Sequence, residues 1–315
     1  MSERPSAPPS AAVTAFRLAA LSTMLAVAMG SVVCATRSGA ACPTWPGCRP
    51  EAIAPRWQLN PVLEFGHRAV AITAGPLILA SAVTSLRLPG TGWRVRLLPW
   101  VALACAIASG AFGRLVVLRS IPTWLGAVDL ACALAAMTLT AISAVSVGTA
   151  QVLRARPEPV APRLARPAVA ALVTLVALHV TGVFAAGTGS YTRCLGWPLW
   201  RLVDVDPHPA LQVVRLVLAA AAAALTVRVA LVAARSERCR PLGAALAGLL
   251  GGEAALGLVL AARGLHDGLA SAYSVIAVVL LWCLALLAGL AGPDPAAVPR
   301  GPGRRTLQEA DAAAE

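Results

Sequence analysis

Long apolar segments alternate with short polar or arginine-containing ones over most of the chain. A helix needs roughly 20 predominantly apolar residues to cross a bilayer, and eight segments come close to that length. We expect spans near Val13–Ala35, Pro61–Leu86, Leu97–Leu118, Ile121–Val147, Pro167–Ala186, Pro209–Val232, Pro241–Ala262 and Leu269–Ala291. Four of these spans open with proline, where a missing N–H does no harm. The pattern predicts eight transmembrane helices.

The composition supports helices surrounded by membrane lipid. Hydrophobic residues make up 58% of the chain and charged residues 13%, whereas a soluble domain averages about 25% charged residues. The mean hydropathy is +0.75. Aromatic residues are few, at 4%, and the apolar runs are long, which favours helical spans over the short alternating strands of a barrel. The expected fold class is therefore all-α integral membrane.

The arginines indicate an orientation. The formal net charge is +12, and all 26 basic residues are arginine. They gather mainly in every second connection, so the rule that basic loops stay inside places both termini in the cytoplasm. The loops around Cys42 and Cys194 then face outward, where disulfides persist. We expect a multi-pass protein of the cell (plasma) membrane, and its basic loops need no nucleic-acid partner to explain them.

An internal repeat divides the chain. Thr36, Ser38, Cys42, Trp45 and Pro46 recur at one fixed offset as Thr188, Ser190, Cys194, Trp197 and Pro198. The simplest architecture is two pseudo-symmetric four-helix bundles whose first outer loops correspond. We expect an N-terminal half over residues 13–148, a cytoplasmic linker over 149–166 and a C-terminal half over 167–291. Residues 1–12 and 292–315 are expected to be disordered cytoplasmic tails.

Two ionisable residues early in the second span carry the clearest chemistry. Glu64 and His67 are three residues apart and share one helix face. Ionisable groups within a span are costly and usually face the bundle interior. A neutral His at that depth can ligate heme iron, and the neighbouring Glu can hold its tautomer or move a proton. The alternative is a buried Glu–His hydrogen bond with no cofactor.

These motifs resemble a known family. The segment Ser38-Gly39, followed by Cys42-Pro43-x-Trp45-Pro46-x-Cys48 and by Glu64-x-x-His67-Arg68 in the next span, resembles the heme A synthase family of cytochrome oxidase assembly. That family also consists of two four-helix halves. The resemblance covers roughly the whole membrane region, and its specific motifs lie in the N-terminal half.

The resemblance implies a reaction and a set of site residues. The family oxidises a ring methyl of heme O to the formyl group of heme A. It implies that the N-terminal half holds the heme, either heme b or the substrate heme O. His67 would ligate the iron, Glu64 would be an essential acidic residue and Arg68 would help to bind the cofactor. Cys42 and Cys48 would form a disulfide, either structural or redox-sensitive. The implied partners are the farnesyltransferase that makes heme O and oxidase assembly factors.

The chain departs from the family at the other three expected histidine ligands. Asp129 occupies the vacated ligand position of the fourth helix. Aligning the segment from Pro209 with that from Pro61 puts Gln212 at the Glu64 position and Arg215 at the His67 position. In the eighth helix the counterpart is Tyr273, or Ser274 after a slip of one residue. A second heme in the C-terminal half is therefore doubtful.

Two hypotheses address the C-terminal half. In one, His208 and His266, each seven residues before an expected ligand position, form a displaced heme site; the alternative is two interfacial histidines. In the other, the heme has been lost and Arg215 pairs with Glu253 across its place, because an arginine within lipid needs a partner. His179 is expected to make a hydrogen bond between helices.

The sequence thus favours a heme A synthase-like membrane oxidoreductase. The alternative is a non-catalytic relative that binds one heme or none and acts in oxidase assembly or heme handling. A small transporter with internal repeats is a third hypothesis, and the cysteine-containing outer loop argues against it.

Overall fold

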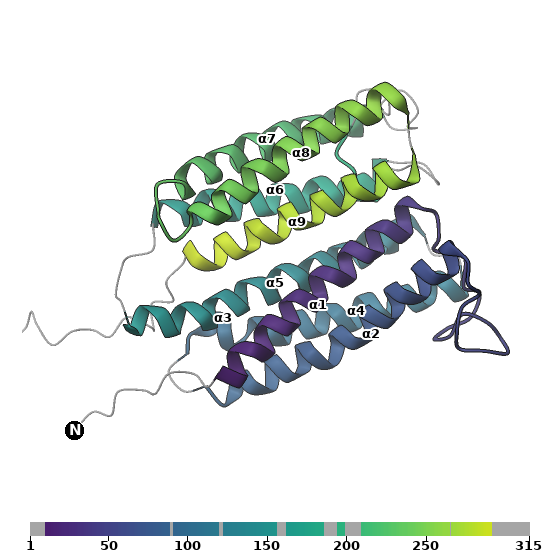
Figure 1. The fold of residues 1–315 in the computed structure, drawn as a ribbon, viewed down its shortest axis with the longest axis horizontal. Helices are drawn as coiled ribbons and strands as arrows, with labels where there is room; N and C mark the ends of the chain where they lie inside the picture. Colours follow the sequence, from purple (N-terminus) through teal and green to yellow (C-terminus); the bar gives the residue numbers. More distant parts are fainter. Residues whose placement is uncertain are drawn as a thin grey trace, which may run out of the picture.

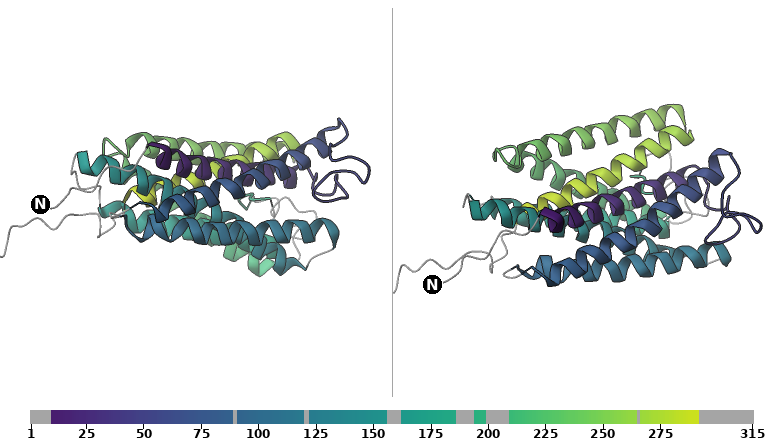
Figure 2. Two further views of the ribbon diagram at one scale, coloured as in Figure 1. Left: turned by 90° about the horizontal axis from the view of Figure 1, so that it is seen from below. Right: turned by 60° about the horizontal axis from the view of Figure 1, so that its bottom comes forward.

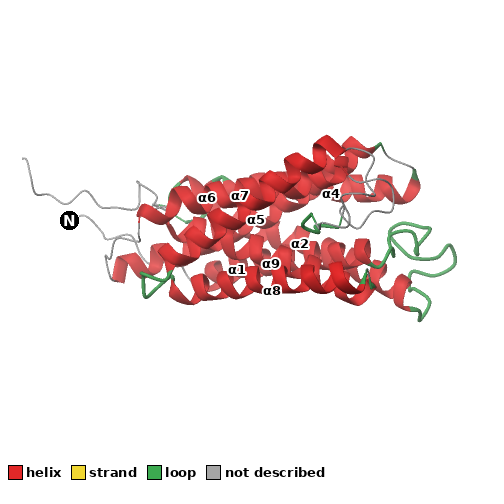
Figure 3. Cartoon of the chain, turned by 90° about the horizontal axis from the view of Figure 1, so that it is seen from above, coloured by secondary structure: helices red, strands yellow, loops and turns green. Residues whose placement is uncertain are grey.

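The structure, a computed structural model, describes residues 10–88, 91–119, 122–155, 162–185, 194–198, 209–264 and 266–291. Within these residues the regular secondary structure is helical throughout (Figure 3). Eight of the helical segments are long and apolar enough to cross a membrane. The expected class, an all-helical protein with eight spans, is confirmed. The expected disordered tails and the place of His208 lie largely or wholly outside the described residues.

The helices agree with the expected spans to within several residues. They are α1 (Ser10–Ala35), α2 (Leu59–Leu86), the short α3 (Trp93–Arg96), α4 (Leu98–Leu118), α5 (Thr123–Ala155), α6 (Pro162–Ala185), α7 (Pro209–Ala233), α8 (Arg240–Arg263) and α9 (Asp267–Ala291). The third span combines α3 and α4. Helix α6 begins five residues before Pro167, which lies inside it. Neighbouring helices and side-chain hydroxyls can satisfy the carbonyl that such a proline leaves free, so membrane helices tolerate it.

The long helices pack as two similar rings. Helix α1 packs on α2, α2 on α4, α4 on α5 and α5 back on α1; in the same order α6 packs on α7, α7 on α8, α8 on α9 and α9 back on α6. Figure 1 shows the two groups side by side, and Figure 2 shows their helices running along one common direction. Helix α9 contacts α1 and α5, and α5 also contacts α6. We call these groups the first ring and the second ring.

Helix α9 is the most deeply buried span, since it packs on both rings. A Cβ added to Gly289 would lie 3.2 Å from both the Cα and the carbonyl oxygen of Ile142 in α5. Small residues allow this close approach of membrane helices. Between α1 and α5, the hydroxyls of Thr23 and Thr140 share a hydrogen bond of 2.8 Å. The contact of α9 with α5, between the two rings, is therefore close-packed, whereas the Thr23–Thr140 bond joins two helices of the first ring.

The outer part of the first ring is packed differently. From Leu59 to Thr73, α2 buries only two side chains, and both are charged: Glu64 and Arg68. No described apolar side chain of α4 beyond Ala102 is buried. On α2 and α4, buried apolar side chains therefore lie toward the inner end, and charged side chains are buried nearer the outer end.

Candidate functional site

A disulfide-closed loop covers the outer end of the first ring. Residues 36–58, here called the cap loop, connect α1 to α2 and project beyond the helix ends (Figure 1). Cys42 and Cys48 form a disulfide within it, and both are buried. The disulfide that the resemblance implied is thus present. Trp45 of the loop also lies 5.4 Å from the guanidinium of Arg114, at the outer end of α4, in a cation–π contact.

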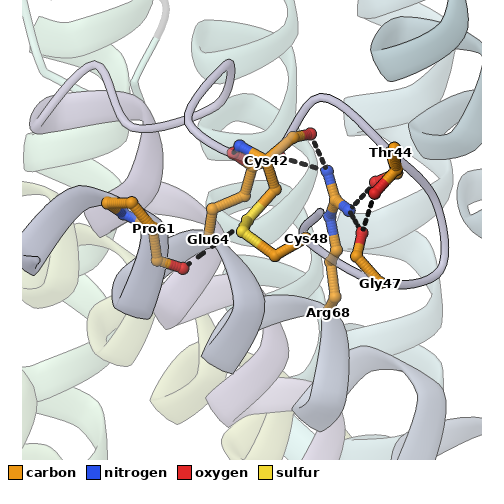
Figure 4. Close-up of polar contacts among 7 residues, drawn as sticks. All are labelled: Cys42, Thr44, Gly47, Cys48, Pro61, Glu64 and Arg68. Atoms are coloured by element: carbon orange, nitrogen blue, oxygen red, sulfur yellow. Dashed lines mark hydrogen bonds and ion pairs between the residues drawn. A yellow bond between two sulfur atoms is a disulfide. The ribbon is translucent and has the colours of Figure 1, made fainter. Parts of the chain in front are cut away.

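Arg68 holds the cap loop to α2. Its Nη1 atom donates to the carbonyl oxygens of Thr44 and of Gly47, the latter at 2.9 Å. Its Nη2 atom donates to the carbonyl oxygen of Cys42 at 2.9 Å and forms an ion pair with Glu64 (Figure 4). The terminal nitrogens of the guanidinium are therefore committed to protein. The structure gives Arg68 a role in fixing the loop, and the expected contact with a cofactor stays a prediction.

Glu64 is the second anchor of the cap loop. It is 3% exposed, and its Oε2 atom accepts the backbone N–H of Cys42 at 2.7 Å while Oε1 meets Arg68. A buried carboxylate is tolerated when it is paired and hydrogen-bonded in this way. The sequence suggested that Glu64 holds the tautomer of His67 or moves a proton. In the structure the carboxylate accepts from the Cys42 N–H and pairs with Arg68, and Nδ1 of His67 has no hydrogen-bond partner among the described residues.

His67 lies one turn below this cap and against α1. A Cβ added to Gly30 of α1 would lie 3.0 Å from Cε1 of the ring and 3.4 Å from Nε2. The imidazole approaches the backbone of Ala26, but no hydrogen bond of ordinary geometry forms, and the buried Nδ1 atom has no partner in the part of the chain that the structure describes. Buried polar atoms without a partner are uncommon in folded proteins. The imidazole therefore has a defined seat and an unused ring nitrogen.

Asp129, at the vacated ligand position, lies on α5 and is half-buried. Its Oδ1 atom accepts a hydrogen bond of 2.6 Å from the hydroxyl of Ser109 on α4. This bond ties the two helices together in the outer part of the first ring, where few apolar side chains are buried. The structure thus gives Asp129 a partner in the protein, and Ser109 was not identified from the sequence.

The second ring has a related loop anchor. Residues 194–198, here called the second outer segment, are held by Arg215, whose Nη2 donates to the carbonyl oxygen of Gly196 at 3.2 Å, and by Ser274, whose hydroxyl donates to that of Cys194 at 2.7 Å. By the repeat offset, Gly196 corresponds to Thr44, whose carbonyl accepts from Arg68. Arg215 therefore occupies the position equivalent to His67 but makes the contact of Arg68.

The expected pair of Arg215 and Glu253 does not form. Arg215 is fully buried and also donates to Gln212 at 3.3 Å, whereas both carboxylate oxygens of Glu253 are buried without a hydrogen-bond partner among the described residues. Equal depth along neighbouring helices did not guarantee that the two side chains meet. The reason is that the guanidinium extends outward to the loop, away from the membrane centre.

The remaining histidines have different surroundings. His179 on α6 is buried and lies within electrostatic range of Arg215. Neither of its ring nitrogens has a hydrogen-bond partner among the described residues, so the expected bond between helices is not made. His266 is exposed and precedes α9. The displaced heme site of His208 and His266 stays untested, because His208 lies outside the described residues. Tyr273 is buried in α9.

A second disulfide was not expected. Cys34, at the outer end of α1, is bonded to Cys194 of the second outer segment. The sequence places Cys34 at the edge of an apolar span, where cysteine usually behaves as a small hydrophobe. The only sequence signal was indirect: Cys194 repeats Cys42 but has no counterpart of Cys48 nearby, since Trp200 stands at that position.

Comparison with known proteins supports the resemblance. No protein-family model matches the chain. A protein named heme A synthase, from Symbiobacterium thermophilum, is 30% identical over 184 residues. The match covers 56% of this chain and 59% of that protein, which is less than two thirds of its length. The match agrees with the resemblance drawn from the Cys loop and the Glu-x-x-His-Arg motif: over 184 residues the chain is similar to a protein named heme A synthase.

Proposed function

We propose that this chain is a membrane oxidoreductase of heme A biosynthesis that takes heme O as substrate and oxidises a ring methyl to a formyl group. The first ring holds the heme, and the product serves cytochrome oxidase assembly. Sequence similarity to a protein named heme A synthase supports a role in heme A biosynthesis. The proposal adds a specific reaction and a specific site.

The observation that carries the proposal is the environment of His67. Its imidazole lies against α1, and its buried Nδ1 atom has no hydrogen-bond partner among the described residues. A histidine side chain not committed to a protein hydrogen bond is the residue type that holds heme iron in histidine-ligated proteins. The outer turns of α2 and α4, which bury no described apolar side chain, are consistent with an apolar ligand beside them. Of the described residues, His67 would therefore be the one to hold the heme iron.

The chain's own groups have distinct tasks in this scheme. When bound, heme O would supply the reacting methyl, and an external oxidant would take up the four electrons removed as the methyl becomes a formyl group. His67 would hold the heme iron through its imidazole. Glu64 and Arg68 close the cap loop over the outer end, and this cover limits water at the reacting edge, which strengthens electrostatic interactions within the site. Glu64 can exchange a proton only after it releases the Cys42 N–H or Arg68.

A second candidate function has specific support. In it the chain is a non-catalytic relative that carries one heme or none in oxidase assembly or heme handling. Asp129 has a carboxylate instead of an imidazole, and this carboxylate accepts a hydrogen bond from the hydroxyl of Ser109. Arg215 fills the equivalent of the His67 position and is bonded to the second outer segment. Both features remove ligands on which the family's chemistry depends.

Heme analysis in living cells separates the two candidates. The chain is expressed in a bacterium that makes heme O but lacks its own heme A synthase, and the hemes are extracted and resolved by chromatography. Accumulation of heme A with the wild-type chain, and its loss in His67→Ala, supports the oxidoreductase. Heme O alone, at wild-type expression levels, supports the non-catalytic relative.

We also propose that the cap loop and the second outer segment lie outside the cytoplasm, in the plasma membrane of the cell. The rule of basic inner loops supports this orientation, and the disulfides require an oxidising compartment. A membrane-impermeant maleimide should label a cysteine introduced at the exposed Trp57 in intact cells. Labelling that occurs only after the membrane is permeabilised would show that the cap loop faces the cytoplasm and would contradict the proposed orientation.

A further inference from the structure

The Cys34–Cys194 disulfide joins the two rings covalently. The two cysteines are 160 positions apart in the sequence, and their Cα atoms are 5.3 Å apart. Cys34 belongs to the last turn of α1 in the first ring. Cys194 begins the second outer segment, which belongs to the second ring through its hydrogen bonds. The bond thus connects a helix end in one ring to a fixed loop of the other.

The second outer segment is a firm attachment point. Cys194, Leu195 and Trp197 are each less than a tenth exposed. Arg215 on α7 and Ser274 on α9 each donate to a backbone carbonyl of the segment. Helices α7 and α9 therefore hold the second outer segment in place independently of the disulfide, so Cys194 has a fixed position relative to the second ring.

The other end of the bond acts on the seat of His67. Cys34 follows Gly30 by four residues, which is about one helical turn. Gly30 is the contact point of the imidazole, where an added Cβ would come within 3.0 Å of the ring. Gly66 makes the same surface close-fitting, because its added Cβ would lie 3.1 Å from the terminal methyl of Met29. A small shift of α1 would therefore move the imidazole of His67.

We propose that Cys34–Cys194 is a positioning bond: the second ring, through its loop anchored by Arg215 and Ser274, holds α1 against His67 and sets the orientation of the imidazole. The second ring then contributes to the site without a cofactor of its own. Any effect of this bond on heme binding rests on the proposed function. Its effect on the position of the His67 imidazole does not.

The bond forms by oxidation of two thiols. Cys34 and Cys194 lose two protons and two electrons as the S–S bond forms, and a disulfide-exchange partner outside the membrane takes them up as its own disulfide becomes two thiols. No other group of the chain changes its oxidation state.

The primary test measures His67 in heme-free protein, so that no iron protects the imidazole from the reagent. Full-length protein in detergent is treated with diethyl pyrocarbonate, which acylates accessible neutral imidazoles, and modification at each histidine is followed by mass spectrometry. We expect Cys34→Ser, Cys194→Ser and the double variant to raise the rate at His67 by the same several-fold factor, since any of them removes the one bond. The exposed His266 serves as an internal reference.

A second variant and a control complete the design. Gly30→Ala displaces the ring while the disulfide stays intact, so it should change the rate at His67 without changing the disulfide map. Cys239→Ser removes a free cysteine near the inner end of α8 and should leave the rate unchanged. The wild-type disulfide is mapped by non-reducing proteolysis and mass spectrometry, which must show a peptide pair containing Cys34 and Cys194.

Three results would overturn the proposal. The first is the absence of that peptide pair from the wild type. The second is an unchanged rate at His67 in the folded serine variants. The third is effects of the two single variants that add in the double variant, since they would show two independent thiols. If the wild type binds heme, the serine variants should also shift its Soret band. A wild type without heme, but with the expected histidine rates, would contradict the proposed function and leave the positioning bond standing.

Discussion

At the scale of residues, two positions related by the internal repeat have taken opposite roles. His67 faces α1 with an unused ring nitrogen, while Arg215 reaches outward and holds a loop carbonyl. In the first ring it is the next residue, Arg68, that donates to a loop carbonyl, as Arg215 does in the second ring. Arginine at the position aligned with His67 thus anchors a loop, which is consistent with the proposal that the first ring binds the heme.

The cap loop should depend on Arg68. In Arg68→Gln, Glu64 would remain buried without its ion partner and three carbonyls would lose their donor. Breaking a buried pair from one side costs about 3–5 kcal/mol. We expect a lower unfolding temperature in detergent and faster proteolysis within residues 36–58. The exposed Arg56→Gln serves as the control, and equal behaviour of the two variants would contradict the anchor.

Glu253 gives a prediction of opposite sign. Both of its carboxylate oxygens are buried without a partner, and an unsatisfied buried polar group costs about 1–3 kcal/mol, more if it is charged. Glu253→Leu should therefore raise the unfolding temperature, with Glu253→Gln between it and the wild type. Loss of stability in Glu253→Leu, together with an equal loss in Arg215→Leu and no further loss in the double variant, would restore the ion pair of the sequence hypothesis.

At the scale of helices, the eight spans could be predicted because each follows from local composition. Length and hydropathy decide whether a segment can cross the bilayer, and the helix ends differ from expectation mainly where a helix continues into an arginine-containing connection, as α5 does beyond Val147. The partners of Glu64, Arg215 and Cys34 could not be predicted. They lie on loops whose paths depend on tertiary packing, and spacing along one helix carries no information about them.

The two disulfides close chain loops of very different length. The chain-entropy model gives about 5 kcal/mol for a closed loop of the size between Cys34 and Cys194, and about 2 kcal/mol for that between Cys42 and Cys48. These are upper values here, because helices that stay inserted in the membrane already restrict the unfolded chain. The order still holds, so the bond between rings should matter more for the whole molecule than the bond within the cap loop.

The contact of α5 with α9 offers a test of helix packing. An alanine at Gly289 would place its Cβ 3.2 Å from backbone atoms of Ile142 and 3.3 Å from Cβ of Val145. Backbone atoms cannot move aside as a flexible side chain can, so Gly289→Ala should destabilise the protein by about 1–3 kcal/mol. Gly75→Ala on α2, where an added Cβ meets nothing within 4 Å, should be neutral in the same unfolding measurement. Equal stability of the two variants would refute the close contact.

At the scale of the whole molecule, two rings with the same order of helix contacts carry different chemistry. The first keeps a seated histidine under a disulfide-closed loop, and the second keeps a loop anchor and a disulfide that reaches α1. The repeat in the sequence predicted the likeness of the two loops. It could not predict that one ring would support the other, because the supporting bond uses a cysteine outside the repeated motif.

The central claim is that His67 binds a heme in the first ring. The most direct measurement is the absorption spectrum and extracted-heme content of purified protein from cells that make heme O, compared between the wild type and His67→Ala. We expect about one heme O or heme A per wild-type chain, since the first ring retains its histidine, and a nearly colourless variant of equal stability. A colourless wild type, or equal heme in both proteins, would contradict it.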